Sequence, residues 1–197
     1  MSAAALIGAV VALVVLLPAR VLAHRRRTGR TGVVLRRSAP GAPRRAAALL
    51  AVGTVLVGLG PAGHLVGLDW AWTPGDAFIT HAAGFLLLAA GLAWAAWAQA
   101  TMREHWRMGQ DEGERTELVT TGPFGRMRHP IYTGMVVVAL GVAMIDPTYP
   151  GAAGVVLLLI GVRLQAIQVE EPHLRTVHGP AYEAWARRTG RFLPPMG

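Results

Sequence analysis

Three long stretches without a charged side chain limit what this chain can fold into. Residues 1–19, 46–68 and 77–102 contain no Asp, Glu, Lys or Arg. Each stretch exceeds the roughly 18 residues that mark a candidate membrane-spanning helix. Charged residues make up 15% of the chain, against about a quarter in soluble domains. Because a domain of this size exposes much of its surface, so few charges indicate that most of the surface faces lipid rather than water.

Two shorter apolar runs follow, and we expect them to form a helical hairpin. They are Ile131–Ile145 and Gly151–Val162, separated by the turn sequence Asp146–Pro150. Neither run alone covers the ~30 Å hydrocarbon core at about 1.5 Å per residue. The second run can continue as a helix to Glu171, where Pro172 is expected to discourage further helix.

The expected fold is therefore an all-α integral membrane protein with about five transmembrane helices and a C-terminal helical hairpin. Residues 1–102 are expected to hold three spans, near 3–22, 46–68 and 77–101. Residues 103–197 are expected to hold a cytoplasmic loop, the hairpin and a C-terminal tail, which together form the functional core. In this tail, the amphipathic segment 180–188 is expected to be a helix at the membrane surface.

The positive charge is arranged as an orientation signal. All 19 basic residues are arginines, and the net charge is +8. The arginines lie in residues 20–45, 103–128 and 163–191, on alternate sides of successive spans, which the positive-inside rule predicts for cytoplasmic segments. We therefore expect an outside N-terminus, a cytoplasmic C-terminus and contact with anionic headgroups of the lipid bilayer, and no nucleic-acid partner.

The same arginines bear on how the chain begins and where it comes from. Val21–Ala23 resembles a signal-peptide cleavage site, but no basic region precedes the apolar run, so we expect a retained first span. The absence of lysine, with abundant arginine and alanine, indicates a GC-rich bacterial genome. The expected location is therefore a bacterial cytoplasmic membrane.

Other features exclude several kinds of chemistry. The chain has no cysteine, which excludes disulfides, thiolate metal sites and a cysteine nucleophile. Gly58–Gly63 matches the G-x-G-x-x-G pattern, but it lies inside an apolar span. We interpret it as a kink or a close helix contact and not as a nucleotide site. No pair of histidines has metal-ligand spacing on a helix, so we expect no metal.

Two polar elements are expected to meet at the cytoplasmic membrane face. Arg128-His129-Pro130 stands where the chain enters the first arm of the hairpin, and Glu170-Glu171 where the second arm returns. Charged residues at the ends of spans are functional candidates. Arginine and histidine can hold a carboxylate, and glutamates can hold an ammonium group or hydroxyls. These residues therefore predict a ligand pocket on the cytoplasmic face.

The stretch from about Glu117 to Pro194, two fifths of the chain, resembles the isoprenylcysteine carboxyl methyltransferase family, which also includes phospholipid methyltransferases. The resemblance rests on the order and spacing of five segments: Leu118–Phe124, Arg126–Gly134, Glu170–Leu174, His178–Tyr182 and Arg191–Pro194. Phe124, His178 and Trp185 depart from the residues that are common in the family at these positions.

This resemblance implies a small helical membrane enzyme that transfers a methyl group from S-adenosylmethionine to a lipid-like or prenylated acceptor, with carboxyl O-methyl transfer favoured. By position, it implies cofactor contacts from eight residues: Gly122, Phe124, Arg128, His129, Pro130, Tyr132, Glu170 and Tyr182. It implies catalytic roles nearer the acceptor for Glu171 and Arg191.

Several alternatives remain open. A phospholipid amine or a small thiol acceptor would need a base, whereas a carboxylate acceptor would need a cation to hold it. An NADPH-dependent enzyme similar to sterol reductases would share the final helices but generally needs more spans. A non-enzymatic lipid-binding bundle predicts that changing His129 or Glu170 leaves ligand binding and thermal stability unaltered. Taken singly, His129 could cap a helix, Tyr132 could be an interfacial anchor and Arg191 could pair with lipid phosphate.

Overall fold

The computed structural model describes residues 1–29, 42–72, 77–102 and 117–195, and within these ranges it is helical apart from short connections. Most of the predicted cytoplasmic loop, residues 103–116, lies outside the described residues. In chain order the elements are α1 (Ser2–Leu16), α2 (Pro18–Thr28), α3 (Ala42–Leu65), α4 (Ala77–Thr101), the 3-10 helix η2 (Gly122–Gly125), α5 (Pro130–Ile145), α6 (Tyr149–Leu164), the π-helix η3 (Gln165–Glu170), α7 (Glu171–His178) and α8 (Pro180–Arg188).

The prediction of an all-α integral membrane protein is confirmed. Among the residues that the structure describes, four continuous helical stretches are long and apolar enough to cross a membrane: Ser2–Arg26, Pro43–Leu65, Ala77–Thr101 and Tyr149–His178. Helix α5 is a shorter apolar helix of 16 residues. Large apolar side chains on the outside of the bundle are exposed, such as Val55, Phe78 and Leu86, which suits a surface in contact with lipid.

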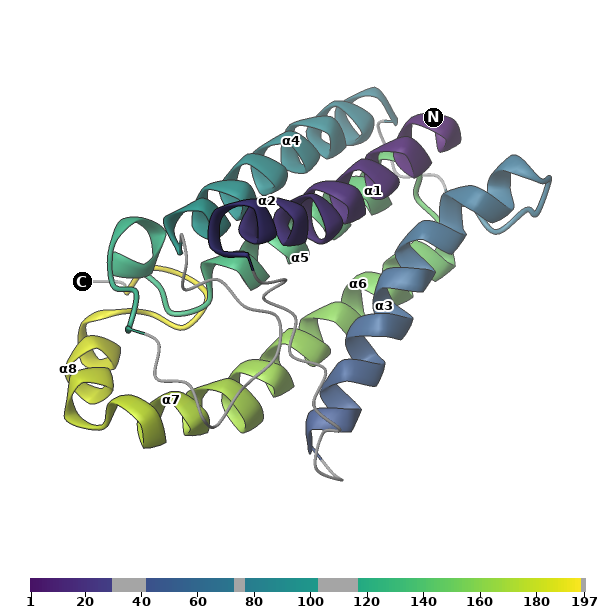
Figure 1. Cartoon of the computed structure of the whole chain (residues 1–197). Helices are drawn as coiled ribbons and strands as arrows, with labels where there is room; N and C mark the ends of the chain where they lie inside the picture. The colour runs from purple at the N-terminus through teal and green to yellow at the C-terminus, as the bar shows by residue number, and fades with distance from the viewer. Residues whose placement is uncertain (30–41, 73–76, 103–116, 196–197) are drawn as a thin grey trace.

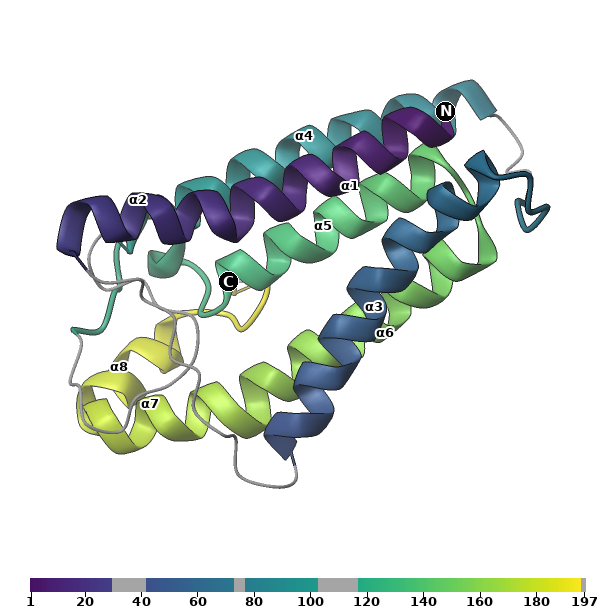
Figure 2. The ribbon, with the colours of Figure 1, turned by 45° about the vertical axis from the view of Figure 1, so that its right-hand side comes forward.

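The membrane helices form two groups, which Figures 1 and 2 show from two sides. Helices α1, α4 and α5 lie side by side in one group, and α3 packs along α6 in the other. The groups meet where α5 turns into α6 and diverge toward α7 and α8. The first residues of the chain lie at the joined end, and α7 and α8 lie at the other. Each arm of the hairpin therefore packs against a helix from residues 1–102.

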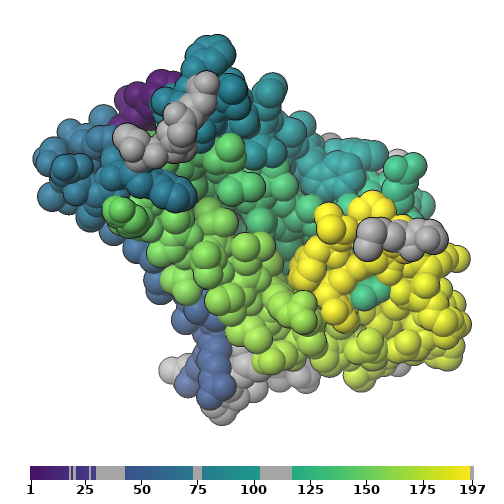
Figure 3. All heavy atoms as spheres, turned by 180° about the vertical axis from the view of Figure 1, so that it is seen from behind, coloured from purple at the N-terminus to yellow at the C-terminus, as the bar shows by residue number. Residues whose placement is uncertain are grey.

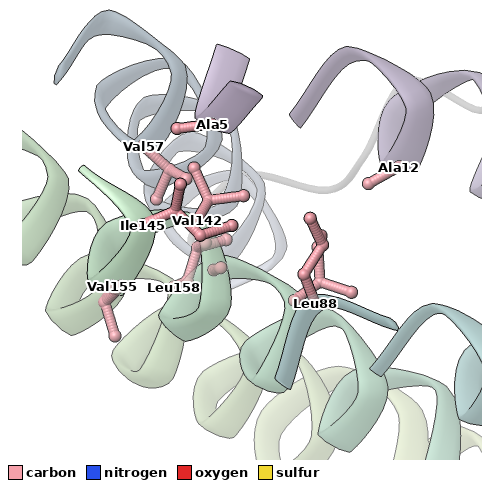
Figure 4. Packing of buried hydrophobic residues seen from close by; sticks show 10 residues of the cluster. Ala5, Ala12, Val57, Leu88, Val142, Ile145, Val155 and Leu158 are labelled. Carbon is pink, nitrogen blue, oxygen red and sulfur yellow. The ribbon is translucent and has the colours of Figure 1, made fainter. Parts of the chain in front are cut away.

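The joined end is held by an apolar core and by backbone hydrogen bonds. The core takes side chains from α1, α3, α4, α5 and α6, among them Leu88 and Leu158, and Figure 4 shows Ala5, Val57, Val142 and Ile145 close together within it. At the turn, the Trp72 N–H donates to the Pro147 carbonyl at 3.1 Å, and the Tyr149 N–H donates to the Trp70 carbonyl at 3.1 Å. These bonds join the segment after α3 to the α5–α6 turn.

Glycines let the paired helices approach closely, as is common in membrane bundles. A Cβ added to Gly141 of α5 would lie 2.5 Å from the Leu88 backbone nitrogen of α4, and a Cβ on Gly91 would lie 2.8 Å from that of Val138. In the G-x-G-x-x-G stretch of α3, a Cβ on Gly60 or Gly63 would overlap Thr148 or Trp70. The Gly60 contact is with the start of α6 and the Gly63 contact is with the segment after α3, so this stretch allows close packing at the joined end.

We predict that Gly141→Ala destabilises the protein, whereas Gly58→Ala does not. The added methyl at residue 141 meets the backbone of α4, which cannot move aside as a side chain can, so overpacking should lower stability by about 1–3 kcal/mol. A Cβ on Gly58 meets nothing within 4 Å, and alanine there should gain up to about 1 kcal/mol of helix propensity. Thermal unfolding in detergent measures both, and equal shifts would contradict the packing argument.

The second arm of the hairpin runs further than the sequence predicts. Helix α6 passes through the π-helix η3 into α7, so the stretch from Tyr149 to His178 is continuous. The prediction that Pro172 ends the helix after Glu171 was wrong. Pro172 lies in the first turn of α7, where a missing N–H breaks no hydrogen bond of that helix. The π-helix Gln165–Glu170 already interrupts the regular α-helical hydrogen bonding before Pro172.

The amphipathic segment Pro180–Arg188 forms helix α8 as predicted. Gly179 lies between α7 and α8. Its φ of +50° is a backbone conformation that strongly favours glycine. Tyr182 and Trp185 are buried against Phe124 and Ala98. Figure 3 shows α8 and the segment after it (yellow) at one end of the molecule, around a small patch of an earlier segment (teal). Helix α8 is thus attached to the bundle, and its place at the membrane surface stays a prediction.

Candidate active site at the end of the hairpin

The segment before α5 reaches the site through a tight turn. Gly122 begins η2 with φ +56°, a left-handed conformation that suits glycine, and a Cβ there would lie 3.1 Å from Thr101. Phe124 is buried in the small core formed with Tyr182 and Trp185. The Trp185 indole N–H donates to the Phe124 carbonyl at 2.8 Å. These contacts fix the turn to α8.

The segment after α8 pairs with the residues that precede α5. The Arg128 N–H donates to the Gly190 carbonyl at 2.8 Å, and the His129 N–H donates to the Arg191 carbonyl at 3.0 Å. The Thr133 hydroxyl donates to the Phe192 carbonyl at 2.7 Å. This pairing places Arg191 next to His129, although 62 residues separate them in sequence.

The Glu171 carboxylate is the centre of the site. It is 1% exposed and accepts two hydrogen bonds from Arg191, with Nε at 2.7 Å from Oε1 and Nη2 at 3.1 Å from Oε2. The Arg128 Nε lies 3.2 Å from Oε1, and the His129 Nε2 lies 3.4 Å from the same oxygen. Arg175, one turn along α7, lies 3.9 Å from Oε2. This carboxylate is therefore surrounded by cations, which is how a buried charge is stabilised.

Glu170 has a different environment. One of its oxygens lies 3.3 Å from the His129 Nδ1, and the other accepts a short hydrogen bond from the Tyr132 hydroxyl. Its side chain is 29% exposed. The two neighbouring glutamates therefore differ in exposure. Glu170 is partly accessible from outside the protein, and Glu171 is enclosed.

Arg128 also holds the end of α8. Its Nη1 donates to the carbonyls of Ala186, at 2.9 Å, and Thr189, at 2.6 Å. The last carbonyls of a helix have no partner within the helix, so a guanidinium can satisfy them. Arg128 thus links the end of α8 to Glu171 through its guanidinium group.

Several side chains of the site have shifted pKa values. Burial lowers the pKa of His129, but the bonds to Glu170 and Glu171 raise it by more, so the net direction is upward. The hydrogen bond to Glu171 raises the pKa of Arg191. Burial raises the pKa of Tyr182, whose hydroxyl is buried without a hydrogen-bond partner in the described part of the chain. Arg191 is therefore a cation and Tyr182 is neutral at neutral pH, and the two glutamates favour the protonated form of His129.

A cavity of about 550 Å³ lies beside this group and not within it. It is lined by the end of α4, including Trp97 and Thr101, and by the extended residues 117–121. None of the charged residues around Glu171 lines it. Charge placement, and not cavity size, therefore locates the candidate site. Within the described ranges, no three histidine or acidic side chains gather as metal ligands would.

The structure thus brings together the predicted residues Arg128, His129, Tyr132, Glu170, Glu171 and Arg191. Gly122, Phe124, Pro130 and Tyr182 lie in the elements that support this group, and the last three are buried. Sequence reasoning did not identify Arg175, Trp185 or Thr189 as parts of the site. Arg175 lies four residues after Glu171, and this helical spacing is the signal that could have indicated it.

The fold and the charged group define a helical membrane protein with a polar site at one end of its hairpin. The phospholipid methyltransferase family profile matches residues 79–181, more than half of the chain. The chain belongs to this family, that of the phospholipid methyltransferases. Methyltransferases of this family generally use S-adenosylmethionine. The resemblance read from the motifs is confirmed.

One curated relative shares part of the sequence. The nickel-cobalt-cadmium resistance protein NccN of Alcaligenes xylosoxydans xylosoxydans is 35% identical over 81 residues, which are 41% of this chain and 38% of NccN. The chain therefore covers less than half of the length of this relative. No solved structure matches the chain.

Proposed function

We propose that this protein transfers a methyl group from S-adenosylmethionine to a lipid-like acceptor at the end of the bundle that carries α7 and α8. The observation that supports this most is the meeting of three motif segments in one charged group. His129 contacts both Glu170 and Glu171, and Arg191 contacts Glu171. The family to which the chain belongs supports the reaction class.

The described residues fit the polar groups of S-adenosylmethionine. The partly exposed Glu170 carboxylate, beside Tyr132, would hold the ammonium group or ribose hydroxyls of the cofactor. The cofactor, when bound, supplies an activated methyl group. Arg191, whose side chain is 33% exposed, would hold a carboxylate on the acceptor side. Alignment of donor and acceptor, with exclusion of water, is then the main task of the protein.

The acceptor that we favour is a carboxylate on a lipid-like molecule, as in a prenylated cysteine. An amine or a thiol must lose a proton, which needs a base. Glu171 is bonded to three cations, and Glu170 is bonded to His129 and Tyr132, so both carboxylates are already engaged in contacts within the protein. A phospholipid amine is the second candidate, because the family profile is that of phospholipid methyltransferases.

We also propose the orientation that the arginines indicate. The described residues Arg25, Arg26, Arg44 and Arg45 lie in α2 and at the start of α3, at the end of the bundle that carries α7 and α8. The site would face the cytoplasm of a bacterial cell, where S-adenosylmethionine is made, and the N-terminus would face outward.

A binding experiment tests this function. Calorimetric titration of the protein in detergent with S-adenosylhomocysteine should show micromolar binding. Glu170→Ala should weaken it about tenfold or more, and Glu183→Gln, which alters an exposed pair with Arg175, should leave it unchanged. With labelled donor, a farnesylated cysteine should then accept methyl groups faster than phosphatidylethanolamine. Failure of a folded, monodisperse wild type to bind would overturn the proposal, and the reverse acceptor order would favour the amine.

A further inference from the structure

His129 is held between two carboxylates. Its Nδ1 lies 3.3 Å from a Glu170 oxygen and its Nε2 lies 3.4 Å from a Glu171 oxygen, and the ring is 4% exposed. An ionised carboxylate only accepts hydrogen bonds, and a neutral imidazole has only one N–H to donate. With both carboxylates ionised, both contacts can be hydrogen bonds only when the ring carries two protons, as an imidazolium.

The π-helix explains how two consecutive residues reach the same ring. In an α-helix, successive side chains point about 100° apart and do not face one partner. Here Glu170 is the last residue of η3 and Glu171 is the first residue of α7. The break in helical geometry falls at this pair, and π-turns within helices are frequent at functional sites. One carboxylate can therefore lie on each side of His129.

The other groups around the ring preserve this arrangement. Arg128 and Arg191 would repel an imidazolium, but both are bonded to Glu171. Tyr132 donates to Glu170, and its ring stacks on the imidazole at 5.8 Å between centroids, while the Phe192 ring lies at 5.7 Å on another side. Because the pKa of His129 is raised, its contribution to folding is fully present below the ordinary value of about 6.5. That contribution is lost only as the pH rises through the higher folded value.

We propose that His129 is a permanently protonated positioning residue that joins the glutamate pair, with Glu171 as a structural anchor and Glu170 as the carboxylate presented to the ligand. The enclosed Glu171, bonded to three cations, has no surface left for a substrate. Glu170 keeps an exposed edge. This inference rests on the proposed function for the identity of the ligand, but the protonation of His129 does not depend on it.

Nitrogen NMR of the imidazole rings tests the protonation directly. The chain has 7 histidines, and ¹⁵N-histidine labelling in detergent, with His129→Gln to identify the signal, isolates this ring. Both ring nitrogens of His129 should still carry protons at pH 8, where an ordinary histidine is roughly 97% neutral. An unprotonated nitrogen at pH 8 would overturn the proposal, whether or not the protein binds a methyl donor.

A matched pair of substitutions tests the division of roles. Glu170→Gln should weaken S-adenosylhomocysteine binding about tenfold and barely change the melting temperature. Glu171→Gln should lower the melting temperature more, and it should weaken the affinity of the folded protein less than Glu170→Gln does. The opposite pattern would contradict the assignment. If Glu171→Gln does not fold, an unchanged affinity in Glu170→Gln is the result that overturns it. If the wild type binds no donor analogue, the proposed function fails, and the ring protonation still decides the role of His129.

Discussion

Glu171→Ala should cause the largest loss of stability of any single substitution considered for this protein. The change removes the carboxylate that neutralises Arg128, His129 and Arg191, and it leaves these cations facing one another. Removing one partner of a buried ion pair typically costs about 3–5 kcal/mol. The Arg191 side chain is one third exposed, so solvent screening places the expected value at the lower limit, about 3 kcal/mol. Chemical or thermal unfolding in detergent measures it.

The control for this prediction is another glutamate that also pairs with arginine. Glu183 lies 2.9 Å from Arg175, and both side chains are about half exposed. Glu183→Ala should change stability by less than about 1 kcal/mol, because exposed ion pairs contribute little. If both substitutions cost the same, the argument from burial at Glu171 fails.

Arg128→Met should have the second largest effect, and it should act at two places. The methionine keeps much of the apolar volume but removes the donors to Glu171 and to the Ala186 and Thr189 carbonyls. Each hydrogen bond from a charged group contributes about 1.5–3 kcal/mol, so a loss of at least about 2 kcal/mol is expected after relaxation. We expect α8 to become more accessible, which hydrogen exchange of residues 180–188 would show.

A matched arginine controls for the loss of charge alone. Arg188, at the end of α8, is exposed, and Arg188→Met should change stability by less than about 0.5 kcal/mol. Unchanged protection of α8 in Arg128→Met would show that Arg128 does not hold this helix.

Much of the membrane part could be predicted because burial in lipid imposes a simple rule on the sequence. The uncharged stretch 77–102 and helix α4, Ala77–Thr101, differ by one residue. The α5–α6 turn also falls at the predicted Asp146–Pro150 sequence. The extension of the last span through Pro172 could not be predicted, because local propensity gives no sign of a π-helix that interrupts α6. In the structure, this π-helix ends at Glu170, where Glu170 and Glu171 contact the distant residue His129.

The sequence predicted which residues meet in the candidate site, but it did not predict which of them pair with one another. Topology and motif order indicated that Arg128 and His129 would meet Glu170 and Glu171, and they do. What the sequence did not show is that Arg191 and Glu171 neutralise each other. Their pairing depends on the return of the segment after α8 along residues 126–133. Backbone pairing of two irregular segments leaves no periodic pattern in a sequence.

The pairing of residues 126–129 with residues 190–191 depends on a segment that follows all of the described membrane helices in the sequence. All the apolar spans precede residue 179, so they can enter the membrane while the segment after α8 is still being synthesised. The Arg128 and His129 N–H groups bond to the Gly190 and Arg191 carbonyls, and the Arg191 side chain bonds to Glu171. These contacts form only after the segment that follows α8 has been synthesised. Closing this long loop is an entropic step that insertion does not complete. The charged group is therefore complete only when Gly190 and Arg191 have paired with the segment before α5 and with Glu171.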